Sequence, residues 1–242
     1  MNAKRFKILY YKFLLKYFGR FTKNDLYNRI LKMEGFEVGK GTIFYSPETI
    51  VIDRQRPWML KIGEYCKVTR GVTILTHDYS RSVLRRAFGE ILGEARMTII
   101  GNNVFIGVNS TILMGAQIGN NVIVGAGSVV GGRIPDNVVV AGNPAKVVRT
   151  LDEHYERRKQ AVLKEAKIWF ESYKDRYGHY PNEQQAGPFF PLFTNRDTFD
   201  YENDHRLFCN GDNMEDVISD FKKGHPMFDS FEDFLEYLKG NN

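Results

Sequence analysis

Residues 100–134 read IGNNVFIGVNSTILMGAQIGNNVIVGAGSVVGGRI, and an aliphatic side chain returns at every sixth position of this stretch. The aliphatic positions are Ile100, Ile106, Ile112, Ile118, Val124 and Val130. Glycine follows five of them, at Gly101, Gly107, Gly119, Gly125 and Gly131, and Leu113 follows the sixth. A small or β-branched residue stands four places after each aliphatic one, at Val104, Ser110, Ala116, Val122, Ser128 and Ile134.

A period of six fits neither a helix of 3.6 residues per turn nor a hairpin ladder, in which the chain reverses. It fits short strands joined by sharp corners, so that the chain winds as a coil. The aliphatic residue points inward, glycine permits the corner, and the small residue fills the narrow interior without overpacking it. The repeat therefore predicts a mainly β fold in which rungs stack about 4.8 Å apart as parallel sheets.

The same phase continues upstream of the decisive stretch. Its aliphatic or aromatic positions are Val38, Phe44, Ile50, Ile62, Val68 and Ile74, with Arg56 at the one missing place. An insertion over residues 54–58 is expected to interrupt that coil. Ile74 and Ile100 are 26 residues apart, which is four repeats plus two, so the register must break there. We expect residues 79–97 to leave the coil as an excursion loop.

The two ends of the chain do not follow the period. Residues 1–34 are predicted as an N-terminal helical segment, 35–150 as the coil domain and 151–242 as a C-terminal helical extension. A helix over Lys4–Phe21 is expected to cap the open end of the coil, and its basic stripe also suits an anionic membrane surface. In the extension, Asn213 and Ser230 are typical N-caps of two short acidic helices.

Composition bounds the cellular setting. Lysines interrupt the apolar N-terminal run, which argues against a signal peptide, and no stretch reaches the roughly 18 apolar residues of a membrane span. The two cysteines, Cys66 and Cys209, are far apart and belong to no metal-binding pattern. We expect a cytoplasmic protein, with contact at the inner face of the membrane through residues 4–21 left open.

Three motifs carry a family resemblance: THDYS at 76–80, IGNNVFIGVNSTI at 100–112 and AGNPAKVVR at 141–149. Over about residues 35–150 the chain resembles the hexapeptide-repeat acyltransferases, particularly sugar and polysaccharide O-acetyltransferases. The resemblance implies a left-handed parallel β-helix and a homotrimer. It also implies acetyl-CoA as the acyl donor, a saccharide as the acceptor and no metal.

Acyl transfer to an alcohol needs a base, because a hydroxyl that keeps its proton is a poor nucleophile. Histidine, with an ordinary pKa of about 6.5, suits this task. Of the five histidines only His77 lies in the repeat region, where the coil gives way to the excursion. The resemblance implies that His77 takes the acceptor proton while the hydroxyl attacks the acetyl group directly. Asp78 orients the imidazole or the acceptor, or forms a local turn.

The resemblance also implies positions for the acyl donor. Backbone N–H groups at Val108 and Asn109 match the family's oxyanion donor, although Asn109 is equally a residue that tolerates a left-handed corner. The remaining positions that match the coenzyme site are Ala126, Gly127, Gly131, Gly132, Lys146 and Arg149, the last two for phosphates. Relatives often carry Thr-Lys where Gly131 and Gly132 stand; the neighbouring Arg133 either replaces that cation or is simply solvated.

Acceptor recognition is assigned to fewer residues. Asp53 matches an acidic acceptor-site residue of sugar acetyltransferases. Arg81 and Arg85, with Arg86 and Arg96, give the excursion a positive charge. That charge suits an anionic saccharide or acidic groups of a neighbouring subunit, and a solvated surface is the alternative.

Other functions were weighed against this interpretation. Transfer to the nitrogen of an amino sugar and a catalytically silent scaffold remain alternatives. A γ-type carbonic anhydrase needs three zinc-binding histidines on adjacent rungs, and this coil holds one. Residues 1–150 carry 22 basic and 10 acidic side chains, which attracts anions, but no nucleic-acid-binding motif accompanies them. We therefore expect no nucleic-acid partner.

Overall fold

The computed structural model describes residues 10–11, 20–204, 206–207 and 212–240. The chain divides into two compact units, residues 1–154 and 155–242. The predicted helix over Lys4–Phe21 lies almost entirely outside the described residues. In the described part of the chain, no helix is long and apolar enough to cross a membrane.

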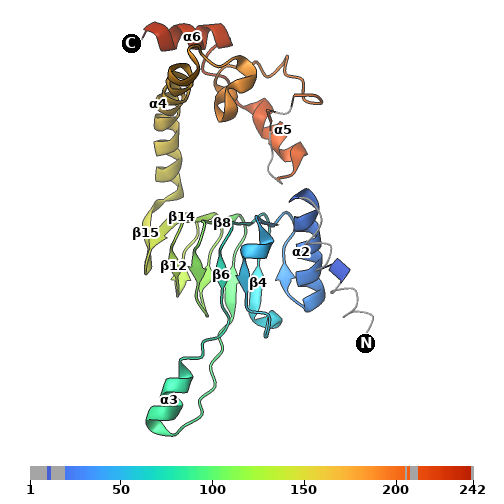
Figure 1. The fold of residues 1–242 in the computed structure, drawn as a ribbon, viewed down its shortest axis with the longest axis vertical. Helices are drawn as coiled ribbons and strands as arrows, with labels where there is room; N and C mark the ends of the chain where they lie inside the picture. Colours follow the sequence, from blue (N-terminus) through green and yellow to red (C-terminus); the bar gives the residue numbers. More distant parts are fainter. Residues whose placement is uncertain (1–9, 12–19, 205, 208–211, 241–242) are drawn as a thin grey trace. The chain divides into compact units, whose positions relative to one another are not determined.

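The first unit is a coil of short strands that form three sheets (Figure 1). Sheet A contains β1 (Glu37–Val38), β4 (Leu60–Ile62), β7 (Thr98–Ile100), β10 (Gln117–Ile118) and β13 (Arg133–Ile134). Sheet B contains β2 (Ile43–Phe44), β5 (Lys67–Val68), β8 (Val104–Ile106), β11 (Val122–Val124), β14 (Val138–Gly142) and β15 (Ala145–Thr150). Sheet C contains β3 (Val51–Ile52), β6 (Thr73–Ile74), β9 (Thr111–Ile112) and β12 (Val129–Val130). All neighbours pair in parallel except β14 and β15, which are antiparallel.

The register confirms the predicted parallel coil. Ile106 pairs with Val124 in sheet B, and Ile112 pairs with Val130 in sheet C. All four side chains are buried in one core that runs through the coil. Identical positions of successive repeats therefore stack on one another, which is how a six-residue period buries a continuous apolar interior.

The register also corrects the predicted phase in two places. Ile52, not Ile50, pairs with Ile74, because the 3-10 helix η1 (Pro47–Thr49) adds two residues before β3. A further four residues around η2 (Pro57–Met59) separate β3 from β4, and Arg56 lies in that insertion. Ile134 does not occupy the small-residue position of the repeat. It pairs with Ile118 at an aliphatic position, because the corner after Val130 is two residues shorter than the other corners of the repeat.

The corners explain the recurring glycine and asparagine. Gly107 is fixed by crowding, since a β-carbon there would lie 2.5 Å from the Ala126 backbone nitrogen. Asn103, Asn121 and Asn137 are left-handed at one corner and form a ladder, in which Asn103 donates to Asn121 and Asn121 donates to Asn137, each at 2.9 Å. Asparagine suits this place because it tolerates positive φ and bonds locally.

Two segments leave the coil where the chain passes from sheet C to sheet A, an edge we name the C–A corner. The first is the insertion that carries η2. The second is the arm between β6 and β7, which contains α3 (Arg81–Phe88) and projects away from the strands (Figure 1). The apolar side chains of Val83 and Phe88 on this helix are exposed.

Helix α2 (Arg20–Glu34) packs beside the first coil. Tyr27 and Leu31 are buried in the same cluster as Phe44, and the Tyr27 ring meets the Phe44 ring edge-on at 5.0 Å. Asn24 accepts a hydrogen bond from the Phe44 backbone N–H at 2.9 Å. This helix begins where the predicted cap ends, so covering of the coil by residues 4–21 remains a prediction.

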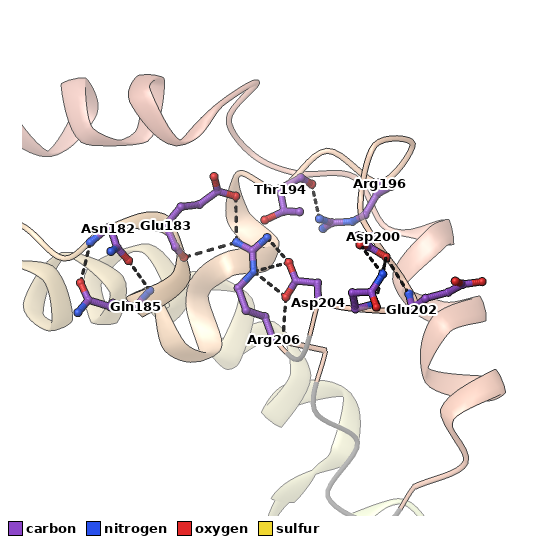
Figure 2. A network of polar contacts seen from close by, with 10 residues as sticks. Asn182, Glu183, Gln185, Thr194, Arg196, Asp200, Glu202, Asp204 and Arg206 are labelled. Carbon is purple, nitrogen blue, oxygen red and sulfur yellow. Dashed lines mark hydrogen bonds and ion pairs between the residues drawn. The ribbon is translucent and has the colours of Figure 1, made fainter.

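The second unit is helical and has its own aromatic core. The long helix α4 (Leu151–Tyr177) starts in the first unit and continues into the second. It is followed by η3 (Glu183–Gln185), η4 (Gly187–Leu192), α5 (Met214–Lys223) and α6 (Phe231–Gly240). Phe170, Phe193 and Phe234 are buried there. The predicted caps are present, since Asn213 accepts from Glu215 N–H and Ser230 from Asp233 N–H. Figure 2 shows the polar network of this unit, in which Arg206 binds Glu183 and Asp204.

Candidate active site

The register of sheet C brings Asp53 beside His77. Asp53 follows β3 and donates its backbone N–H to the Ile74 carbonyl at 3.1 Å. Its carboxylate oxygen Oδ2 contacts Nδ1 of His77 and accepts the hydroxyl hydrogen of Thr76. The other oxygen, Oδ1, accepts the Gln55 backbone N–H at 3.1 Å. The carboxylate is thus fixed from three directions.

The environment of Asp53 favours its charged form. Burial by itself raises the pKa of this carboxyl group, but the hydrogen bonds from Thr76, His77 and the Gln55 backbone outweigh burial, so the Asp53 pKa lies below its ordinary value. An ionised carboxylate only accepts hydrogen bonds, so Nδ1 of the neutral imidazole carries the hydrogen. The lone pair of Nε2 is then available as a base. The His77 side chain is 28% exposed, which leaves it within reach of a substrate.

Of the roles that the sequence left open for Asp78, the structure shows the local turn. Its carboxylate accepts the backbone N–H of Ser80, just before α3, and this bond lowers the Asp78 pKa. Asp78 therefore forms the local turn, and the carboxylate that orients the imidazole is Asp53. The sequence pattern did not predict this pair because it placed Ile50 at the aliphatic position of its rung. The structure places Ile52 there, paired with Ile74, so Asp53 lies on the rung next to the one that leads to His77.

Gly131 and Gly132 lie at the same C–A corner as His77. They follow β12, and the Leu113 N–H donates to the Val130 carbonyl at 2.8 Å one rung earlier. A β-carbon on Gly131 would contact the Leu113 side chain at 3.3 Å. We name this edge, with Asp53 and His77, the base half-site.

The other predicted donor residues gather where the chain passes from sheet B to sheet C, the B–C corner. The Gly127 N–H donates to the Val108 carbonyl at 2.8 Å, so the corner of Ala126 and Gly127 stacks on that of Val108 and Asn109. Asn109 has φ 58°, a left-handed corner conformation, and its backbone N–H, predicted as an oxyanion donor, instead donates to the Arg70 carbonyl at 3.1 Å. Lys146 pairs with Ala141 near the end of β14 that reaches this corner. We name this edge the donor half-site.

Arg149 lies at the opposite end of β15. It pairs with Val139, and its Nη1 is 3.5 Å from Nδ1 of His154. Arg81 and Arg85 lie on α3, where the Arg81 guanidinium donates to the Leu92 carbonyl at 3.2 Å and faces the Tyr79 ring. None of these contacts involves Asp53 or His77, and the partners of the three arginines among the described residues are local.

Within one chain the two half-sites lie on opposite edges of sheet C. Asn109 and Leu113 bound β9 at opposite corners, and four residue steps of about 3.3 Å separate them by roughly 13 Å. An oxyanion donor and a base must both lie about 3 Å from the groups they serve. The chain therefore places the predicted base on one edge of sheet C and most of the predicted donor residues on the other.

The described residues form no metal-binding cluster, and the cavity of the second unit lacks the predicted catalytic residues. Among them no cluster of three His, Cys, Asp or Glu side chains could hold a metal ion. The second unit contains an open cavity of about 1000 Å³ beside Phe190, Asp204 and Arg206. None of the residues predicted for catalysis lines that cavity.

Comparison with known proteins agrees with this architecture. Residues 97–132 match the bacterial transferase hexapeptide family (six repeats). Protein CapG of Staphylococcus aureus is 41% identical over 139 residues, which are 57% of this chain and 80% of that protein. The putative acetyltransferase YvoF of Bacillus subtilis is 35% identical over 58% of this chain and 73% of its own length. Galactoside O-acetyltransferase of Escherichia coli is 51% identical over 50% of this chain and 59% of its own length.

The chain belongs to the hexapeptide-repeat acetyltransferase family. It is accordingly an acyltransferase, and membership implies the left-handed sense of its coil.

Proposed function

We propose that the protein is an O-acetyltransferase that moves an acetyl group from acetyl-CoA to a hydroxyl of a saccharide, with His77 as general base. The observation that carries this proposal is the buried Asp53 carboxylate on Nδ1 of His77, which leaves Nε2 as the proton acceptor. The similarity to a galactoside O-acetyltransferase supports the choice of acceptor.

The reaction needs no acyl-enzyme. Nε2 of His77 removes the hydroxyl proton as the acceptor oxygen attacks the thioester carbonyl, and a new C–O bond forms. The backbone N–H of Val108 stabilises the tetrahedral oxyanion. The C–S bond then breaks, and the leaving thiolate takes the proton from the His77 imidazolium. Asp53 stabilises the imidazolium between these two steps, as carboxylates do in other base-assisted acyl transfers.

Acetyl-CoA is proposed to lie along the donor half-site, with a phosphate reached by Lys146. Ala126 and Gly127 are exposed there, and nothing lies within 4 Å of a β-carbon added to Gly127, so the corner leaves room for a ligand. Gly131 and Gly132 contribute from the base half-site, without the cation that relatives carry. Arg149 is proposed as a second, more peripheral phosphate contact.

Removing these cations is expected to weaken donor binding. Lys146→Ala should raise the Michaelis constant for acetyl-CoA about tenfold, because a charge-assisted phosphate contact is lost. Arg149→Ala should raise it less, since that side chain lies farther from Ala126. Both effects should grow at low salt, where screening is weaker. Steady-state kinetics at two ionic strengths measures this, and unchanged constants in both variants would place the phosphates elsewhere.

A homotrimer would unite the two half-sites. When the C–A corner of one chain meets the B–C corner of the next, sheet C faces the threefold axis. The outward residues of sheet C are Val51, Thr73, Thr111 and Val129, aligned in register and uncharged. Sheet A instead presents Glu37, Lys61 and Arg133 outward. Small uncharged side chains suit close packing between chains, so sheet C is the face we assign to the trimer contact.

The proposed reaction is tested by thiol release from acetyl-CoA with a panel of sugars, amino sugars and polysaccharide fragments. We expect release with a saccharide and a product that hydroxylamine cleaves, because esters are labile to it and amides are not. An amide product would identify the N-acetyltransferase alternative. Absence of both transfer and acetyl-CoA binding would favour the silent scaffold. Contact of residues 4–21 with a membrane stays a separate prediction.

A further inference from the structure

Burial and three contacts leave the Asp53 carboxylate little room for an acceptor. Its two oxygens are engaged by Thr76, His77 and Gln55, and its residue surface is only 8% exposed. The sequence had assigned Asp53 to acceptor hydroxyls, and its position in the structure makes it a partner of the imidazole instead. An acceptor ring at the base half-site would therefore need a contact other than Asp53.

Trp58 is placed to provide that contact. It lies in η2, within the insertion that leaves the coil immediately after Asp53, and the residue is 67% exposed. Tryptophan is usually buried to a large extent, so a tryptophan this exposed beside the base half-site is a candidate ligand contact. A single exposed apolar residue is ordinary on a surface, and what distinguishes Trp58 is where and how it is held.

The insertion is anchored on three sides. The Gln55 N–H bonds to Asp53, Arg54 pairs with Glu34 at the end of α2, and Pro57 lies against the turn at Gly35, where a β-carbon would be 3.6 Å from Pro57 Cγ. The Arg54 guanidinium also faces the Tyr27 ring at 5.8 Å. These contacts fix the backbone just before Trp58, and the chain enters β4 at Leu60, two residues after it.

The insertion and His77 share one edge of the coil. Figure 1 shows the η2 segment and the α3 arm leaving the strands on the same side. Leu60, two residues after Trp58, pairs with Thr98, whose hydroxyl donates to the Leu75 carbonyl at 2.7 Å. His77 follows two residues after Leu75, and neighbouring rungs are about 4.8 Å apart. Trp58 therefore lies at the same edge of the coil as the base, on the segment between Asp53, which contacts His77, and Leu60, which pairs with Thr98.

We infer that Trp58 is the acceptor platform: its indole stacks on the apolar C–H face of a pyranose ring and turns a hydroxyl of that ring toward Nε2 of His77. This inference rests on the proposed function and specifies its acceptor as a cyclic saccharide. An aromatic ring contributes a large flat apolar surface at a small entropic cost, which suits a ring that has one apolar face. Trp58 positions the substrate and moves no proton.

The kinetic test compares Trp58→Ala, Trp58→Phe and the matched control Tyr177→Ala, which removes a ring that is 60% exposed in the second unit. The acceptors are methyl glucoside, galactoside and mannoside, with glycerol as a hydroxyl acceptor that lacks a ring. Trp58→Ala should raise the Michaelis constant for the best glycoside about tenfold and leave those for acetyl-CoA and glycerol unchanged. Trp58→Phe should retain most of the affinity, and Tyr177→Ala should match the wild type.

A second measurement is independent of activity. The chain has two tryptophans, so in a Trp169→Phe background the emission reports Trp58 alone. Adding the glycosides without acetyl-CoA should change that emission, and glycerol should not. If the wild type acetylates a glycoside while Trp58→Ala keeps its affinity, the platform is refuted and the proposed function stands. If no saccharide is acetylated, the proposed function fails, and emission that no glycoside alters then refutes the platform as well.

Discussion

His77→Ala is expected to lower kcat at least about 100-fold while the dissociation constant for acetyl-CoA stays nearly unchanged. The variant removes the group that accepts the hydroxyl proton, whereas the proposed coenzyme contacts lie on the donor half-site, on the other edge of sheet C. Single-turnover rates and equilibrium binding of acetyl-CoA separate these two effects. His179→Ala, which alters a histidine of the second unit, serves as the control and should retain wild-type turnover. Near-normal kcat in His77→Ala would refute the mechanism.

The partner of His77 offers a finer version of the same test. Asp53→Asn keeps the size of the side chain, but its amide can present hydrogens to Nδ1 and thereby favour the tautomer in which Nε2 is protonated. Turnover should fall by about 100-fold with little change in binding, because the imidazole remains and only its proton is misplaced. An effect confined to the acceptor Michaelis constant would instead return Asp53 to the acceptor-binding role that the sequence suggested.

The same variant has a signature in stability against pH. The Asp53 pKa is lower in the folded chain than its ordinary value of about 3.9, so the ionised carboxylate stabilises the fold fully above that value. This contribution is lost as the pH falls through the lowered pKa. The difference in the free energy of unfolding between the wild type and Asp53→Asn should therefore be larger at neutral pH than in strong acid, as measured by denaturant titration.

Mixing two inactive variants is expected to restore activity. His77→Ala disables the base half-site, and Ala126→Trp blocks the donor half-site by filling an exposed corner. If each site combines halves from neighbouring chains, random mixed trimers should contain intact sites at about a quarter of the positions. Thiol release should then reach about a quarter of the wild-type rate, whereas each variant alone should show almost none.

Two observations would contradict this arrangement. Mixed trimers that recover no activity would mean that both halves act within one chain. A fully active monomer by light scattering would refute the shared site directly.

A charge placed on the trimer face, as in Thr111→Lys, should separate the chains and abolish turnover without altering the His77–Asp53 contact, because the Thr111 side chain points outward from sheet C. Thr111→Val provides the matched control for size and should leave the assembly intact.

The sequence by itself determined the parallel coil, the family and the residue proposed as base. Each follows from information that is local along the chain: a period of six fixes how often a side chain turns inward, and glycine or asparagine permits the corner between strands. His77 was found because it is the only histidine in the repeat region, at the point where the excursion begins. The caps at Asn213 and Ser230 were likewise predictable, since capping depends on residues a few positions apart.

Only the tertiary structure decided which residues lie together. The pairing of Ile52 with Ile74 depends on where the extra residues of the first coil are accommodated, and a shift of two positions moves Asp53 from a presumed acceptor contact to Nδ1 of His77. The separation of Val108 and Ala126 from His77 depends on which corner each residue occupies, and a periodic sequence looks the same at every corner. Because rungs stack, a small difference in spacing along the chain changes which residues meet between neighbouring rungs. These contacts can be known only when the register of the whole coil is known.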